Sequence, residues 1–317
     1  MNLLKVLISC ILFYSVNALT VPKFSISKNQ VLKVGICSVL LSTSPITSLQ
    51  FNSIPSVLAA EVSDDKIDDK FGKTEVQGEL LKLYTRGLRL QQPGEDLNEA
   101  QKVFEELVQV EPNFIYGWTN LGNVLTSLGD LDDAILCYNK AISLKPPSNA
   151  LAVIALNRAS IFMSTGKVKQ ALQDMDAAER IGGTSSSILT NKAVALSYLG
   201  DWPGSTAMFE RVINTAERNA LPWWLRYSQS LLETNRIAEA LPYYQRTLNR
   251  FPEETECKAF GVALYQALGS PKEARKYWTS MREDEKKEYN QGSEYLSKQL
   301  HWGPRAIAAF QKFQASN

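Results

Sequence analysis

Apolar residues recur at helical spacing in paired blocks through most of the chain, and each pair of blocks repeats after about 34 residues. Small residues such as Gly122 and Ala159 mark one point of the first block, and large residues such as Tyr138 mark one point of the second. Gly or Asn stands between the two blocks, where a left-handed residue ends a helix. The pattern therefore predicts helical hairpins, which must stack because one hairpin cannot bury its apolar face alone.

The second copy of the pattern is the clearest. It reads Trp118-x2-Leu121-Gly122-x2-Leu125 and then Ala134-x3-Tyr138-x2-Ala141-x4-Pro146. This copy resembles the tetratricopeptide repeat (TPR) at every signature position. The resemblance covers about 80–282 and implies an all-α, right-handed superhelical TPR solenoid of about six helix-turn-helix repeats. The repeats are expected at about 81–114, 115–151, 152–185, 186–220, 221–254 and 255–282.

The C-terminal residues 283–317 are expected to form capping helices. A mixed-charge helix starts at Arg282, and His301-Trp302-Gly303-Pro304 then breaks the chain. Residues 305–313 form an amphipathic pattern with Ile307, Phe310 and Phe313 on one side. We interpret this helix as the cap that closes the solenoid, with a docking helix for a partner as the alternative.

The N-terminal sixty residues contain no acidic residue, since the first is Glu61. Residues 1–18 are typical of a signal peptide, and 19–60 of a transit peptide with a possible thylakoid-lumen signal. An acidic linker at 61–79 follows. This arrangement resembles the bipartite presequence of plastid-targeted proteins in algae with secondary plastids. It predicts a plastid (chloroplast) location, in the thylakoid lumen rather than the stroma, with secretion as the alternative.

Composition argues against catalysis and nucleic-acid binding. Without the four lysines of the first sixty residues, 30 basic residues face 33 acidic ones, a net charge of −3 that does not suit nucleic acid. The single histidine and four cysteines exclude a multi-histidine metal site and make a disulfide framework improbable. Gly-rich phosphate loops and nucleophile elbows are absent from the sequence. We therefore expect no enzyme, no cofactor, no metal and no small-molecule substrate.

The resemblance implies where a partner binds, because in TPR arrays the first helix of each hairpin lines an inner face that takes peptides. Asparagine offers a donor and an acceptor to an extended peptide backbone. The predicted peptide-binding residues are Arg86, Arg89, Asn120, Asn123, Asn157, Asn191 and Arg226. In the alternative interpretation, Asn157 and Asn191 only form hydrogen bonds within the solenoid. A clamp for a C-terminal carboxylate is not expected, because Thr119, Ser187 and Asn191 stand at its three basic positions.

Together these patterns predict a non-catalytic scaffold that binds a protein or an extended peptide in a plastid. A role in the assembly or stabilisation of a photosynthetic complex follows by analogy with other plastid TPR proteins, with possible peripheral association with thylakoid complexes. The alternatives are a stromal chaperone-like or import-related peptide binder, and a scaffold subunit of an enzyme complex.

Overall fold

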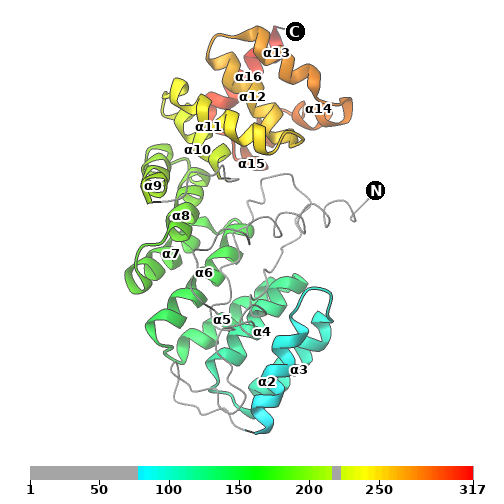
Figure 1. The fold of residues 1–317 in the computed structure, drawn as a ribbon, viewed down its shortest axis with the longest axis vertical. Helices are drawn as coiled ribbons and strands as arrows, with labels where there is room; N and C mark the ends of the chain where they lie inside the picture. The colour runs from blue at the N-terminus through cyan, green and yellow to red at the C-terminus, as the bar shows by residue number, and fades with distance from the viewer. Residues whose placement is uncertain (1–77, 216–222, 317) are drawn as a thin grey trace, which may run out of the picture. The chain divides into compact units, whose positions relative to one another are not determined.

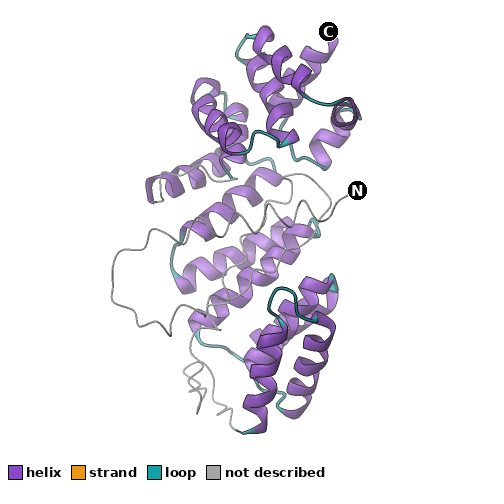
Figure 2. Ribbon diagram, turned by 45° about the vertical axis from the view of Figure 1, so that its right-hand side comes forward, coloured by secondary structure: helices purple, strands orange, loops and turns teal. Residues whose placement is uncertain are grey.

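The computed structural model describes residues 78–215 and 223–316, and within these ranges it contains helices and loops without a strand (Figures 1 and 2). The predicted signal peptide and transit peptide, and nearly all of the predicted acidic linker, lie outside the described residues. No helix in the described ranges is both long enough and apolar enough to cross a membrane.

Twelve helices form six hairpins in chain order (Figure 1). The first helices of the hairpins are α2 (Glu79–Leu90), α4 (Ile115–Leu128), α6 (Ser148–Ser164), α8 (Ser186–Tyr198), α10 (Trp224–Glu233) and α12 (Thr255–Ala267). The second helices are α3 (Leu97–Val110), α5 (Leu131–Ser143), α7 (Val168–Gly182), α9 (Trp202–Thr215), α11 (Ile237–Arg250) and α13 (Pro271–Ser280). Each helix packs against the next one in the chain, so the hairpins stack in sequence order. This confirms the predicted all-α TPR solenoid.

The residues that predicted the hairpins also hold them together. Ala134 and Tyr138 are buried, and a Cβ atom built on Gly122 would lie 2.8 Å from the Tyr138 ring. The helices therefore cross closely at Gly122 because no side chain separates them. Gly129 has φ of 93° and Asn235 has φ of 65°, so both take the left-handed conformation that ends a first helix.

Three further helices follow the sixth hairpin: α14 (Glu283–Tyr289), α15 (Ser293–Lys298) and α16 (Pro304–Ala315). We call residues 292–316 the C-terminal segment. Helix α16 packs against α12 and also reaches α10 in the preceding hairpin. Its buried side chains Phe310 and Phe313 lie against Trp278 of α13. The predicted cap is therefore present, and it covers first helices as well as the end of the array.

Candidate peptide-binding face

The predicted site residues of the first hairpin are exposed cations. Arg86 and Arg89 both lie on α2 with exposed side chains. The Arg86 Nη2 atom lies 2.6 Å from Glu99 Oε1 on α3, so its charge is already paired within the hairpin. Such an exposed pair is weak, so both cations remain accessible to solvent.

The structure places Asn120 in the core, which does not fit the predicted peptide-binding role. Its side chain is 3% exposed. The Nδ2 atom donates to the Tyr116 carbonyl at 2.8 Å and to the Tyr84 hydroxyl at 3.4 Å. The repeat pattern places Asn120 on the inner side of α4, but there its side chain meets Tyr84 of α2. Asn120 therefore joins the first two hairpins.

Asn123 and Asn157 are brought together. The Asn157 Nδ2 atom donates to Asn123 Oδ1 at 3.0 Å, and the Tyr138 hydroxyl donates to the same oxygen at 2.7 Å. Both asparagines remain partly exposed. The Asn191 side chain, one repeat further on α8, is also partly exposed and forms no hydrogen bond with any residue that the structure describes. These three amides lie on three successive first helices, α4, α6 and α8.

The helices that carry these three amides have almost no charge. Helix α4 has no charged residue, α6 has only Arg158 and α8 has only Lys192. Arg158 forms a two-pronged hydrogen bond to Asp174 at 2.8 and 2.7 Å. The Lys192 Nζ atom lies 2.6 Å from Glu179 and 2.7 Å from Asp176. We call Asn123, Asn157 and Asn191 the amide row. Both cations near it are engaged by acids of α7.

Arg226, the last predicted site residue, is enclosed by the chain itself, which corrects its predicted role on an open face. All ten residues of α10 are buried, and the Arg226 side chain is 1% exposed. Its Nη1 atom donates to Gln229 Oε1 and to the Leu300 carbonyl, both at 2.8 Å. Its Nη2 atom lies 3.4 Å from Glu256 Oε1 on α12.

The C-terminal segment continues this cover onto α12. The Trp302 indole donates to Glu256 Oε1 at 3.3 Å, and its ring lies 5.9 Å from that of Phe260. Glu256 is fully buried, and burial raises its pKa, while the Arg226 charge opposes that rise. Sequence reasoning missed this cover. The available signal, an amphipathic helix at 304–315 whose apolar side must be buried, predicted a cap but not which helices it covers.

His301 is a structural residue in this arrangement. Its φ is 52°, and its ring stacks on Tyr198 with the centroids 3.7 Å apart. Burial, with the Arg226 charge as a smaller cause, lowers its pKa to about 4. The imidazole is therefore neutral at physiological pH and faces an aromatic ring. No group of three or more His, Cys, Asp or Glu side chains suited to a metal ion occurs in the described parts of the chain.

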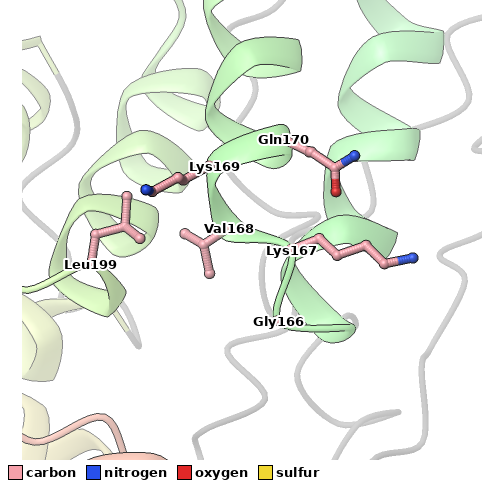
Figure 3. Close-up of a pocket in the computed structure, with 6 residues that line it drawn as sticks. All are labelled: Gly166, Lys167, Val168, Lys169, Gln170 and Leu199. Carbon is pink, nitrogen blue, oxygen red and sulfur yellow. The ribbon is translucent and has the colours of Figure 1, made fainter.

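An open pocket lies at the start of α7, next to the turn after α8 (Figure 3). Its lining residues are Gly166, Lys167, Val168, Lys169, Gln170 and Leu199. Figure 3 shows Val168 and Lys169 on the side of Leu199, whereas Lys167 and Gln170 extend to the other side. The polar groups do not converge, so the pocket does not form a binding site of the usual kind.

Two segments of the chain match models of the tetratricopeptide repeat family, residues 115–147 and residues 186–219. A stretch of 147 residues is 25% identical to protein FlbA of Caulobacter vibrioides, covering 44% of this chain and 24% of that protein. A stretch of 73 residues is 36% identical to the peroxisomal targeting signal receptor of Komagataella phaffii, covering 23% of this chain and 12% of the receptor. The chain thus spans a quarter or less of the length of these relatives.

Solved structures show the same fold. A tetratricopeptide repeat protein from Parabacteroides merdae superposes with a TM-score of 0.57 at 17% identity, over 75% of this chain and 93% of that one. PilF of Pseudomonas aeruginosa gives a TM-score of 0.55 at 16% identity, over 75% and 97% of the two chains. The chain therefore contains tetratricopeptide repeats and has the fold of a TPR solenoid, an architecture built for protein–protein interaction.

Proposed function

We propose that the chain is a non-catalytic TPR scaffold that binds an extended, uncharged segment of another protein along α4, α6 and α8. The observation that supports this is the amide row on three helices whose only two cations are engaged by acids. Among the residues that the structure describes, the Asn191 side chain has no hydrogen-bond partner and the Asn157 amide oxygen accepts no hydrogen bond, so both can bond a peptide. Without free cations the strip favours a neutral peptide backbone over a carboxylate.

The test is capture of the native partner from the source cells with a tagged full chain, followed by identification and quantification. The double variant Asn157→Ala, Asn191→Ala should retain about a tenth or less of the stoichiometric companion. Asn98→Ala with Asn249→Ala is the matched control, since both are exposed asparagines on second helices. Full retention by the Asn157/Asn191 variant, with its melting temperature unchanged, would reject the amide row as the binding site.

Residues 1–60 support the further proposal that the scaffold acts in a plastid, in the assembly or stabilisation of a photosynthetic complex. A reporter fused to these residues should enter the plastid, and secretion or retention in the endoplasmic reticulum would contradict this. A mature N-terminus near Glu61, together with photosystem or cytochrome subunits as companions, would favour the lumen. Companions that belong to one enzyme complex would instead favour the enzyme-scaffold alternative.

An import-related peptide binder in the stroma is the second candidate. It is supported by the 36% identity of a 73-residue stretch to a protein named as a receptor for a targeting signal. A mature N-terminus between about 19 and 35, with a mixture of clients and no stoichiometric companion, would favour this function over complex assembly.

A further inference from the structure

The C-terminal segment contacts the inner side of α10 and α12 in the way a bound peptide would. Its Leu300 carbonyl accepts from Arg226, which stands at the same repeat position on α10 as Asn191 on α8. Its Trp302 indole donates to Glu256 and packs on Phe260, which holds that repeat position on α12. A main-chain carbonyl and one anchoring aromatic side chain are thus recognised by two consecutive first helices.

The polar groups beneath this segment are incompletely satisfied. Arg226 Nε and Nη2, Glu256 Oε2 and the Tyr289 hydroxyl are buried and form no hydrogen bond within the parts of the chain that the structure describes. Buried polar atoms without partners are rare and costly in folded proteins. The segment therefore covers a polar site that it anchors to but does not complete.

The unused groups define what would complete the site. Arg226 Nε lacks an acceptor and Nη2 has only the ion pair with Glu256 Oε1 at 3.4 Å, whereas Glu256 Oε2 lacks a donor, among the described residues. A side-chain amide supplies one of each and adds no charge beside the Arg226–Glu256 pair. His301, the residue that precedes the anchoring Trp302, lacks this capacity because its ring stacks on Tyr198.

The start of the segment and the start of α16 are held in different ways. It begins at Gly292, whose φ of 97° permits a left-handed connection after α14. At the start of α16, the main-chain N–H groups of Arg305 and Ala306 donate to the buried Glu233 carboxylate at 3.0 and 2.8 Å. The stretch between α15 and α16 is therefore anchored at Arg226, Glu256 and Glu233.

We propose that the inner side of α10 and α12 is a second polypeptide-binding site, and that the C-terminal segment is its resident occupant. A partner segment that carries a tryptophan next to a side-chain amide displaces it. The tryptophan takes the place of Trp302, and the amide bridges Arg226 and Glu256. This inference goes beyond the proposed function and does not depend on the amide row, because the two sites share no residue.

The test uses fluorescein-labelled synthetic peptides of residues 293–316, read by fluorescence anisotropy against the full chain. The wild-type chain should bind the natural peptide weakly, since its own segment competes at high effective concentration. The Trp302→Ala chain should bind it at least about tenfold more tightly. A peptide with His301→Asn should bind this chain more tightly still, by about threefold or more. The Trp302→Ala peptide should not bind.

A matched control separates displacement of the C-terminal segment by the peptide from a general loss of structure. Trp118→Ala removes an indole from α4 and should leave peptide binding at the wild-type level. No binding of the natural peptide to a folded Trp302→Ala chain would overturn the proposal. Equal affinity of the natural and His301→Asn peptides would overturn its amide component.

Hydrogen exchange of the wild-type chain keeps the proposal testable if Trp302→Ala does not fold. Displacement requires that the C-terminal segment open without global unfolding. Its amides should then exchange at least about tenfold faster than those of α12. Equal protection of the segment and α12 would show that they open only together, which would refute displacement.

Discussion

Replacing Glu233 by alanine should detach the C-terminal segment from α10. The Glu233 side chain is 8% exposed, and its two oxygens accept from the main-chain N–H groups of Arg305 and Ala306. These are among the first N–H groups of α16, which have no partner within the helix. A carboxylate from one helix therefore caps the N-terminus of another that follows about 70 residues later.

The loss of folding free energy expected for Glu233→Ala follows from two opposing contributions. Hydrogen bonds to a charged group contribute about 1.5–3 kcal/mol each, and loss of an N-cap costs about 0.5–2 kcal/mol. Burial opposes them, since it raises the pKa of Glu233 despite the two main-chain donors. We therefore expect Glu233→Ala to destabilise the fold by about 2–3 kcal/mol, a melting-temperature loss of roughly 4–12 °C. Glu233→Gln should cost less, because it keeps the shape, retains one acceptor and removes the buried charge.

Urea unfolding followed by circular dichroism and tryptophan fluorescence measures this difference at pH 7. Glu294→Ala is the control, because Glu294 lies in the same C-terminal segment and forms an exposed pair with Lys298 at 2.8 Å. Exposed pairs contribute less than about 1 kcal/mol. If Glu233→Ala costs no more than Glu294→Ala, the cap does not hold α16 and the reasoning fails.

The remaining predictions concern the histidine and one close crossing. The pKa of His301 is lowered to about 4 in the folded chain. The neutral imidazole therefore stabilises the folded state fully above pH 6.5, and this contribution is lost as the pH falls toward 4. Against His301→Asn, whose residue tolerates the left-handed backbone, the wild type should lose up to about 2 kcal/mol more between pH 7 and pH 5, and identical urea midpoints would contradict this. Gly122→Ala should cost about 1–3 kcal/mol, because its Cβ meets the Tyr138 ring at 2.8 Å, and an unchanged melting temperature would show that the crossing relaxes.

The sequence predicted the hairpins well because their signals are local. Spacing at 3.6 residues per turn, a small residue at Gly122 and a left-handed residue at Gly129 act within one or two turns. The predicted cap was equally local, since Pro304 starts a helix whose apolar side must be buried.

The site was harder to predict because the exposure of each site residue depends on residues far away in the chain. Register placed Asn120 and Arg226 on the inner side, but Tyr84 encloses the first and Leu300 the second. Helical periodicity shows which side of a helix is apolar, not which distant segment covers it. Asn157 forms the intra-solenoid hydrogen bond that the alternative interpretation required, whereas Asn191 forms none with the described residues. Its role as a peptide ligand stays a prediction.

The covering segment follows α10 and α12 in the chain, and this order has a consequence for biosynthesis. A ribosome makes the N-terminal hairpins first, and they can fold as they emerge. Helix α10 cannot be covered until residues 292–316 have left the ribosome, so Arg226 and Glu256 stay uncovered until then. A chain that stops between α12 and residue 292, by a nonsense codon or by proteolysis, keeps that pair and the Phe260 ring uncovered. Quality-control factors that recognise exposed apolar surface thus have, on these two helices, a direct signal of an unfinished chain.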